Sequence, residues 1–281
     1  MGCDCLPTGA AFCSMTAMSE RPRVVPVPVR REQIVSIIER QGFARVVELS
    51  RAFAVSEVTI RADLDALAEA HVIERVHGGA VAGVRALAKE PDFELAMTRA
   101  TSEKRRIGHA AAALVGSDQS VLIDAGSTTT AVARALLARD DLSGVVVFTN
   151  SLTIAFEFEA GEPRFTVGVT GGTVRHKQHS LVDPFGDMFV GLIRGDICFI
   201  GCNGVSVEGI TNSSMPEVSM KKRFMDASRQ RVVVADSSKI GKTQLARVAP
   251  LDAVDLLITG VEAPEVHLAP LREAGVTIQL V

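Results

Sequence analysis

The sequence predicts an α/β protein in which an N-terminal winged helix-turn-helix is joined to a mostly parallel α/β domain. Residues 30–85 show short amphipathic helices, a tight connection and then a pair of strands, which is the order of a winged helix-turn-helix. From residue 102 onward, short Val- and Ile-rich strands alternate with helices, a pattern typical of a parallel sheet covered on both faces. At 281 residues the chain has room for both domains.

Composition argues against a membrane protein, a secreted protein and a disulfide-rich or metal-binding protein. Hydrophobic residues make up 47% of the chain, yet no run approaches the ~18 apolar residues that a membrane helix needs. The first residues lack the charged start and long apolar stretch of a signal peptide, so we expect a cytoplasmic protein that does not enter a membrane. An odd number of cysteines argues against a disulfide framework, and Cys3, Cys5 and Cys13 have no partners at zinc spacing. We therefore expect neither a metal nor a cofactor.

Residues 1–29 are expected to form a disordered tail. Prolines recur as far as Pro28, so a helix should not begin before about Val29. The tail shows no apolar periodicity, and Met15 and Met18 are alternative start sites. We therefore expect the folded part of the chain to begin after this tail.

Helix and strand signals follow the tail in order. The segment 30–41 carries isoleucines at helical spacing, and Gly42 stands where a C-terminal cap belongs. A second, shorter apolar stripe lies in VVELSRAF (46–53). Beyond the third helix, VIERV (72–76) has the composition of a strand, and the turn His77-Gly78-Gly79 can reverse it into another.

The third helix, Ser56–Ala68, is the centre of this unit. Ser56 is a good N-cap because its hydroxyl can accept a bond from a backbone N–H of the first turn. Glu57 then places a negative charge where the helix dipole favours it. The outer face carries short side chains such as Thr59, with Arg61 at its margin. Such a helix can lie close against the DNA major groove, which admits one α-helix; an ordinary solvated helix is the alternative.

The charge balance makes any DNA contact depend on few residues. The whole chain is formally −3. Between Arg30 and Arg85, eight Lys and Arg are matched by eight Asp and Glu, so the N-terminal unit is neutral. A strongly basic face is the usual electrostatic footprint of DNA binding. Without one, binding must rely on a few placed arginines, doubled by dimerisation.

The C-terminal half, residues 102–281, follows a connecting segment over residues 86–101. Six strands are expected, at residues 120–124, 144–148, 165–169, 197–200, 231–235 and 255–259. Helices are expected from Ser102, from Gly126 through Leu137, from Leu152, and over residues 216–227 and 264–274. Cys198 lies in one of these strands, and we interpret it as a small core residue.

Polar clusters follow the expected strands directly. In open parallel sheets, ligands bind beyond the carboxyl ends of the strands. The stretch Asp124–Thr129 ends one strand and begins a helix, where free backbone N–H groups and the helix dipole favour a phosphate. Further clusters stand at the ends of other strands, at residues 149–151, 171–172, 201–204 and 236–239. One such loop is often merely a turn, but several in one register predict a ligand site.

The N-terminal unit resembles the DNA-binding domain of DeoR-type bacterial transcriptional regulators. The match covers nearly all of residues 30–85, and it is carried by S-x-x-T-I-R-x-D-L and a later R-V-H-G-G-A. The resemblance implies that the DNA phosphates, base edges or backbone are contacted by Ser56, Glu57, Thr59, Arg61, His77 and Gly78. One departure is Ala62, where the family commonly has a second basic residue. This departure implies one basic side chain fewer to contact DNA.

The C-terminal half resembles the sugar-sensing domain of the same family, which is related to ribose-5-phosphate isomerase and glucosamine-6-phosphate deaminase. The resemblance is carried by DAGSTTT, TNS, GGTVRHKQHSLVDP, GCNGV, GITN, PEVSMKK and VVVADSSKIG. It implies that the effector site is lined by Asp124, Gly126, Ser127, Thr128, Thr129, Asn150, Gly172, Arg175, Lys221 and Lys239. Two departures can change which ligand the site binds: Asp183 stands where Gly is usual, and Asn203 stands where Asp is common.

These features predict a transcriptional regulator, of the repressor type, for carbohydrate metabolism genes. The expected partners are double-stranded operator DNA and a phosphorylated sugar that releases it, and an inverted-repeat operator would require a homodimer or homotetramer. One alternative is an isomerase-like enzyme, which needs a carboxylate base. Glu208 is the one carboxylate close after the 201–204 loop, and a fused DNA-binding unit has no place in an isomerase, so we expect no catalysis. A DNA-binding scaffold with a vestigial site is the other alternative.

Overall fold

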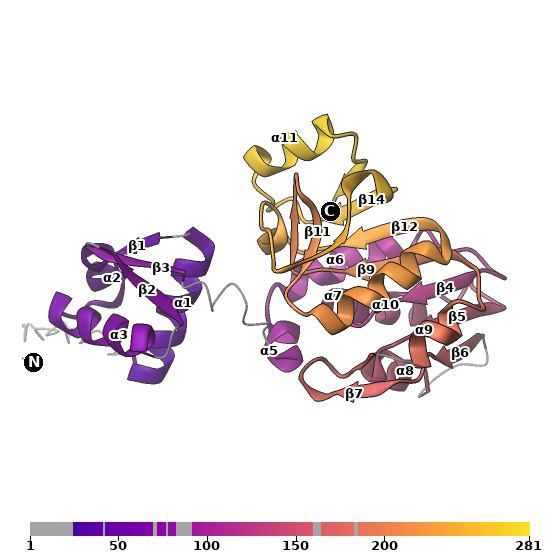
Figure 1. Cartoon of the computed structure of the whole chain (residues 1–281), viewed down its shortest axis with the longest axis horizontal. Coiled ribbons are helices and arrows are strands. Elements are labelled where there is room, and N and C mark those ends of the chain that lie inside the picture. Colours follow the sequence, from indigo (N-terminus) through magenta and orange to yellow (C-terminus); the bar gives the residue numbers. More distant parts are fainter. Residues whose placement is uncertain are drawn as a thin grey trace, which may run out of the picture. The chain divides into compact units, whose positions relative to one another are not determined.

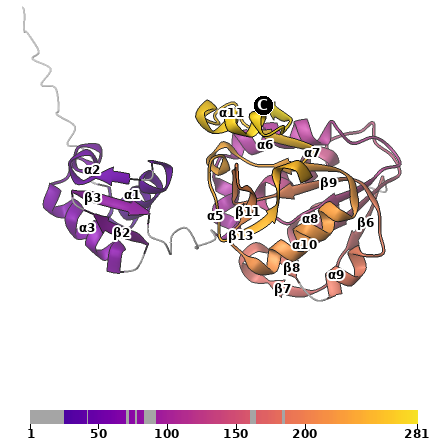
Figure 2. The same ribbon diagram turned by 45° about the horizontal axis from the view of Figure 1, so that its top comes forward.

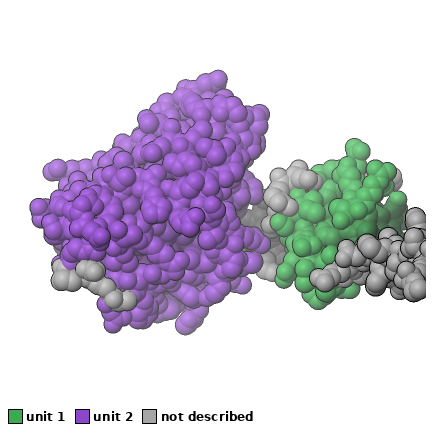
Figure 3. All heavy atoms as spheres, turned by 180° about the vertical axis from the view of Figure 1, so that it is seen from behind, with its two compact units in different colours: residues 1–82 green, residues 83–281 purple. Residues whose placement is uncertain are grey.

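The structure is a computed structural model of the 281-residue chain, and it describes residues 25–41, 43–69, 72–76, 78–82, 92–159, 164–182 and 185–281. The chain forms two compact units, residues 1–82 and 83–281 (Figure 3). Most of the predicted tail, residues 1–24, lies outside the described residues. Within the described ranges, no helix is long and apolar enough to cross a membrane.

The N-terminal unit is a winged helix-turn-helix, as predicted (Figure 1). Its elements are α1 (Val27–Gln41), β1 (Phe43–Arg45), α2 (Val46–Phe53), α3 (Glu57–Glu69), β2 (Ile73–Val76) and β3 (Gly79–Ala82). The three strands form an antiparallel sheet in the order β1-β3-β2. The sequence did not predict β1, because a three-residue strand is too short to show an alternating pattern.

The first helix begins earlier than the sequence predicted. α1 starts at Val27, so the last residues of the predicted tail 1–29 are helical. Pro28 lies in the first turn, where its missing N–H has no intrahelical acceptor to lose. The backbone N–H of Arg30 closes that turn by donating to the Pro26 carbonyl at 2.8 Å.

A buried ion pair fixes α1 against α3. Asp63 faces the interior of the unit, where its carboxylate accepts from Arg30 Nε at 2.6 Å and from Arg31 Nε at 2.9 Å. Burial alone would raise the pKa of Asp63, but the hydrogen bonds and charges of both arginines outweigh burial and lower it. The neighbouring core includes Ile34, Ile60 and other apolar side chains from all three helices.

The C-terminal unit is built on a seven-stranded parallel sheet, which confirms the predicted fold class. Figure 2 shows this unit turned by 45° from the view of Figure 1. Its strands are β4 (Ser120–Ile123), β5 (Val145–Thr149), β6 (Phe165–Val169), β9 (Gly195–Gly201), β12 (Ser228–Val234), β14 (Leu256–Thr259) and β15 (Ile278–Leu280). Smaller antiparallel sheets are formed by β7 (Thr173–Arg175) with β8 (Ser180–Val182), and by β10 (Gly204–Ser206), β11 (Gly209–Asn212) and β13 (Ala246–Ala249).

Helices cover both faces of the large sheet. The helices are α5 (Phe93–Thr98), α6 (Thr101–Ala112), α7 (Ser127–Leu137), α8 (Leu152–Glu159), α9 (Phe185–Val190), α10 (Met215–Asp226) and α11 (Glu265–Glu273). Side chains of α6, α7 and α8 share one core with Val121 and Ile123, whereas those of α9, α10 and α11 share the other with Leu122. Cys198 is fully buried in that second core, as predicted.

The strand order places the predicted ligand loops at a topological switch point. The order is β15-β14-β12-β9-β4-β5-β6, so the chain winds outward from β4 through β6 and then returns to β9 on the other side of β4. Crevices form beyond the carboxyl ends of the two strands at such a reversal, and ligands bind there. The sequence predicted six of these strands but not β15, and it could not predict that β4 and β9 are neighbours.

Two helices on one face approach each other closely because of a glycine. A Cβ atom on Gly108 of α6 would collide with the Ala131 carbonyl of α7. One turn earlier on each helix stand Lys104 and Ser127, and the close approach brings their side chains together. The packing of α6 on α7 therefore places the Lys104 side chain against Ser127, in the predicted ligand stretch Asp124–Thr129.

The predicted connecting segment contains a helix. α5 lies within residues 86–101, while residues 83–91 lie outside the described residues. α6 begins at Thr101, one residue before the Ser102 start that the sequence indicated, and Ala100 before it adopts a left-handed conformation with φ of 50°. A sharp corner thus separates α5 from α6.

Candidate DNA-binding and effector sites

The start of α3 has the geometry that the sequence predicted. The Ser56 hydroxyl accepts from the Thr59 backbone N–H at 3.2 Å, which confirms the N-cap, and the two hydroxyls lie 2.9 Å apart. Ser56 is exposed and Thr59 is half-buried. Both can therefore meet a phosphate or a base edge once DNA lies across this end of the helix.

The Arg61 guanidinium lies on the outer surface of α3 but is not free. It donates to the Glu57 carboxylate at 2.8 Å, one helical turn away, and both side chains are about half exposed. An exposed pair at this spacing contributes about 0.3–0.5 kcal/mol. Arg61 can therefore exchange Glu57 for DNA at little cost. Val58 is exposed on the same surface.

The wing tip depends on two glycines in different ways. Gly78 adopts φ of 79°, and a Cβ there would meet nothing within 4 Å, so the tip is open to an approaching backbone. Gly79 is packed, because a Cβ there would collide with the Ala44 carbonyl. His77, the other residue predicted to approach DNA at this turn, lies outside the described residues.

At the switch point, Asp124 joins the ends of β4 and β9. Its carboxylate accepts from the Gly201 N–H at 3.1 Å and from the Lys221 ammonium, which also donates to the Gly201 carbonyl at 3.1 Å. Burial raises the pKa of Asp124 to about 6 despite Lys221. Burial opposes the charge on Lys221, but Asp124 and Glu217 raise its pKa, so the pair is ionised at neutral pH.

The helix after β4 offers backbone donors more than hydroxyls. The hydroxyls of Thr129 and Thr130 both donate to the Gly126 carbonyl, at 2.9 and 2.7 Å. Both hydroxyls therefore turn toward their own helix, and the Thr129 hydroxyl proton is already donated to Gly126. The first N–H groups of α7 have no acceptor within the helix. Gly126 and Ser127 keep partial exposure, which leaves this end of α7 accessible, whereas Thr128 is buried.

Lys104 is a member of this site that sequence reasoning missed. Its buried ammonium donates to the Ser127 hydroxyl at 3.0 Å and to the Ala96 carbonyl at 2.6 Å, and it lies 3.9 Å from the Asp236 carboxylate. Burial lowers its pKa to about 8. A signal existed in the sequence, because Lys104 is three residues before Ile107 and therefore falls on the inward stripe of its helix.

Lys239 supplies a further cation after β12. It is half-buried, and none of the described carboxylates pairs with its ammonium. The Asp236 carboxylate nearby in sequence accepts from the Ser238 backbone N–H at 3.1 Å and also from the Ser238 hydroxyl. The structure thus leaves the charge of Lys239 available to an anion.

Asn150 and Gly172 shape the site from its other side. The Asn150 side chain accepts from the Ala125 N–H at 2.9 Å and donates to the Leu181 carbonyl at 3.3 Å, so it is a buried clamp between β4, β5 and β8. A Cβ on Gly172 would collide with the Val182 carbonyl, which explains the glycine at the start of the β7–β8 hairpin.

Arg175 does not point a free charge at the ligand. Its guanidinium donates to the Glu217 carboxylate at 2.8 Å, and Glu217 also accepts from the Ser180 hydroxyl at 3.0 Å and the Asn212 amide at 3.3 Å. This network ties the β7–β8 hairpin to α10. Ser214, just before α10, is buried and its hydroxyl has no partner among the described residues, so a ligand or water could satisfy it.

Two of the family departures have different outcomes. The Asn203 side chain accepts from the Ser213 N–H at 3.1 Å and from the Ser213 hydroxyl at 2.9 Å, so it fixes the loop after β9. Asp183 lies outside the described residues. Among the described residues, no group of His, Cys, Asp and Glu is placed to hold a metal ion, and Cys198 and Cys202 are free thiols.

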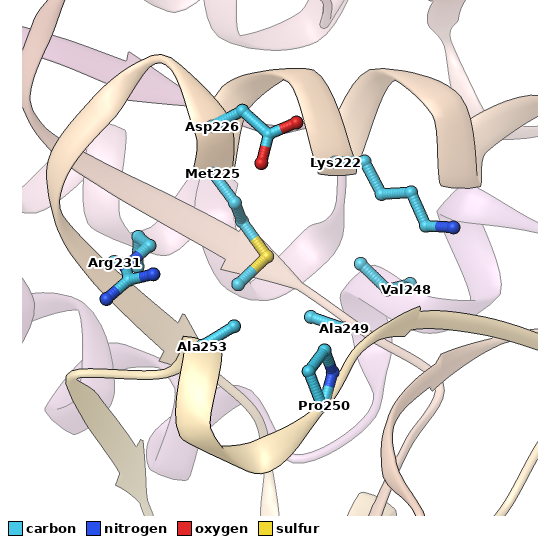
Figure 4. A pocket seen from close by; sticks show the side chains of 8 residues that line it. All are labelled: Lys222, Met225, Asp226, Arg231, Val248, Ala249, Pro250 and Ala253. Atoms are coloured by element: carbon cyan, nitrogen blue, oxygen red, sulfur yellow. The ribbon is translucent and has the colours of Figure 1, made fainter.

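A separate hollow of about 180 Å³ lies away from these residues (Figure 4). Its lining comprises Lys222, Met225, Asp226, Arg231, Val248, Ala249, Pro250 and Ala253. The Arg231 guanidinium is already held by the Asp255 carboxylate through two bonds of 2.9 Å. The hollow shares no residue with the predicted effector site, so we do not assign the effector to it.

Comparison with known proteins gives consistent matches over most of the chain. The DeoR-like helix-turn-helix domain matches residues 30–84, and the DeoR C terminal sensor domain matches residues 99–261. The HTH-type transcriptional regulator GolR of Listeria innocua is 31% identical, over 89% of this chain and 97% of its own. The glycerol-3-phosphate regulon repressor of Haemophilus influenzae is 31% identical, over 87% of this chain and 93% of its own.

A solved structure, ribose 5-phosphate isomerase from Plasmodium falciparum, aligns with 50% of this chain and 53% of its own, at 18% identity and a TM-score of 0.36. So distant a likeness shows nothing about activity. The two domain matches and the full-length relatives, in contrast, agree with the winged helix-turn-helix and the parallel sheet described above. The chain belongs to the DeoR family of DNA-binding transcriptional regulators.

Proposed function

We propose that this regulator represses carbohydrate metabolism genes and leaves its operator when a phosphorylated sugar binds beyond β4 and β9. One observation carries the proposal: at the accessible start of α7, Lys104 donates to Ser127 while the Asp236 carboxylate is 3.9 Å away, and the charge of Lys239 is near enough to lower the pKa of Lys104. A doubly charged phosphate is strongly hydrated, and several amide donors and cations together can replace its water. The named relative that represses a glycerol-3-phosphate regulon supports a phosphorylated effector.

Each predicted effector residue has a distinct role in this proposal. The phosphate lies on the N–H groups of Gly126, Ser127 and Thr128, with Lys239 as a counter-charge. Lys221 is committed to Asp124 and acts as a support beneath the sugar instead of as a free cation. The remaining predicted residues shape the walls of the site: Thr129, Asn150, Gly172 and Arg175.

Binding without catalysis fits the carboxylates of the site. Glu208, the one candidate base that the sequence offered, is exposed on the turn between β10 and β11. The buried Asp124 is held by Lys221 and Gly201, and Glu103 accepts from the Ser237 N–H at 2.5 Å. A base must be free to take a proton from substrate, and we therefore propose no reaction at this site.

The DNA-binding proposal concerns α3 and the wing. Ser56, Thr59 and Arg61 contact phosphates or base edges in the major groove, Glu57 orients Arg61, and Gly78 with His77 approaches the adjacent backbone. An inverted-repeat operator matches a twofold protein, so the active form is a homodimer or homotetramer. Because its target is double-stranded chromosomal DNA, we place the protein in the cytoplasm.

Calorimetry on the full chain tests the effector site. Triose, pentose and hexose phosphates are titrated beside the same sugars without phosphate. One member of the phosphorylated set should bind, and its unphosphorylated counterpart should bind far more weakly. The double variant Ser127→Ala with Lys239→Ala should lose most of this affinity, whereas Lys222→Ala, which removes an exposed lysine of α10, should not. Equal binding by all three proteins, or no phosphorylated ligand at all, would overturn the proposal.

A further inference from the structure

Lys104 joins two segments that are otherwise connected through the sharp corner at Ala100. Its side chain leaves the first turn of α6 and is 5% exposed. One hydrogen bond reaches Ser127 at the start of α7, at 3.0 Å, and another reaches the Ala96 carbonyl in α5, at 2.6 Å. The same ammonium therefore touches the proposed phosphate site and the helix before it in the chain.

The charge of Lys104 is incompletely compensated. Both of its hydrogen-bond acceptors are neutral, and the Asp236 carboxylate lies 3.9 Å away, which is too long for a hydrogen bond. The pKa of Lys104 is lowered to about 8: burial, Lys239 and Arg99 lower it, while Asp236 and Glu103 raise it. A buried cation in this state gains more from an incoming phosphate than from a carbonyl, because bonds between charged partners are about twice as strong.

α5 is held between the two sides of the effector site. It packs on α7, and its buried Phe93 ring lies 5.0 Å from the ring of His179, next to the β7–β8 hairpin. Glu94 pairs with His179 at 2.9 Å and Asp92 with Lys177 at 3.8 Å. Both contacts are partly exposed to solvent and contribute little to stability. The hydrogen bond from the buried Lys104 ammonium to the Ala96 carbonyl, in contrast, holds α5 from the interior.

The corner that follows α5 also favours movement. Ala100 adopts the left-handed conformation, which is costly for a residue with a Cβ and persists only where contacts impose it. Loss of the bond between Lys104 and Ala96 would remove one such contact. In sequence, α5 is the first described helix after residues 83–91, which follow the DNA-binding unit.

We propose that Lys104 is a binding residue for the effector phosphate and that it transmits binding by giving up the Ala96 carbonyl. The ammonium turns from Ala96 to a phosphate oxygen while it keeps Ser127, and α5 is released from its packed position. The first described helix after the DNA-binding unit, α5, then no longer has the bond that Lys104 gave it. The inference rests on the proposed phosphate site, and it adds the route by which occupancy of that site reaches the rest of the chain.

Hydrogen exchange of the full chain tests the inference, with inorganic phosphate as the probe and chloride at matched ionic strength as the reference. In the native protein, the α5 amides should exchange roughly tenfold faster when phosphate is bound, which is the effect of losing one hydrogen bond to a charged group. In Lys104→Met they should exchange fast in both conditions, and phosphate affinity should fall roughly tenfold. Lys177→Met, which removes only the exposed pair to Asp92, should keep the native response.

The outcomes separate the two proposals. If phosphate binds the native protein but α5 exchange does not change, the inference is wrong while the effector site stands. The same holds if Lys104→Met binds phosphate with native affinity. If neither inorganic phosphate nor any sugar phosphate binds the native protein, the effector site itself fails and the role of Lys104 fails with it. The native measurement needs no variant, so a poorly folded Lys104→Met protein does not prevent the test.

Discussion

The two units keep their proposed functional side chains in opposite surroundings. In the DNA-binding unit, Ser56 and Arg61 are exposed, and among the described residues their side chains bond only within the first turns of α3. In the sensor unit, Asp124 and Lys221 are buried and come from positions 97 residues apart. A change in the first set should therefore alter DNA affinity at nearly constant stability, whereas a change in the second set should alter both ligand binding and stability.

The largest effect should come from breaking the buried pair at the switch point. Lys221→Met leaves the Asp124 carboxylate buried without its cation, which should lower the free energy of unfolding of the sensor unit by about 3–5 kcal/mol. Urea denaturation followed by circular dichroism measures this cost. The double variant Lys221→Met with Asp124→Asn should recover part of it. A single variant of native stability would show that this pair is not the buried support described above.

A smaller loss of stability should follow from separating α6 and α7. Gly108→Ala places a Cβ against the Ala131 carbonyl, and such overpacking should cost about 1–3 kcal/mol in the free energy of unfolding. Phosphate affinity should fall as well, because Lys104 moves away from Ser127. Gly116→Ala is the matched control, since a Cβ there has ordinary van der Waals contacts. Equal thermal stability and equal phosphate affinity in both variants would contradict the proposed helix contact.

In the DNA-binding unit, affinity and stability should separate. Arg61→Ala should weaken DNA binding by about 1–3 kcal/mol if the guanidinium makes a bidentate base contact. Its surface pair with Glu57 contributes little, so the free energy of unfolding should change by less than about 0.5 kcal/mol. A gel-shift titration at fixed salt and a thermal melt measure the two quantities. Arg229→Ala, an exposed arginine of the sensor unit, serves as the control; unchanged DNA affinity in Arg61→Ala would remove Arg61 from the interface.

The smallest effect concerns pH. The pKa of Lys104 is about 8, lowered by burial, Lys239 and Arg99 against Asp236 and Glu103. The ammonium therefore loses its charge as pH rises through about 8, and phosphate affinity should fall by at most roughly tenfold between about pH 7 and about pH 9. Calorimetry at several pH values measures this slope. The slope should be absent in Lys104→Met, and a native slope in that variant would assign the titration to another group.

Sequence reasoning succeeded where the cause of a structure is local. The Ser56 cap, the apolar stripe of α3 and the Val-rich strands depend on residues a few positions apart, and each was predicted. The sequence did not predict that β4 and β9 lie next to each other, because strand order is not encoded in any short sequence pattern. The position of Lys104 on the inward stripe of its helix could have been seen in the sequence, but its contacts could not, because they require the packing at Gly108 and the position of Ala96.

The residues predicted from family resemblance differ in whether their side chains are already bonded to other protein groups. Asp124, Asn150 and Arg175 are already bonded to protein groups, and the Thr129 hydroxyl is bonded to Gly126. A motif marks which residues share a site, whereas hydrogen-bond partners decide which of them remain available to a ligand. The partners come from distant segments, so only the structure could supply them.

Coupling between the two units is the central claim, and fluorescence anisotropy of labelled DNA tests it most directly. The intergenic DNA beside this protein's own gene is titrated with the full chain, without ligand and with a sugar phosphate that calorimetry has shown to bind. The account predicts that saturating sugar phosphate weakens DNA binding by about 5–150-fold, which corresponds to a coupling free energy of about 1–3 kcal/mol. Unchanged or tighter DNA binding with the effector bound would contradict it.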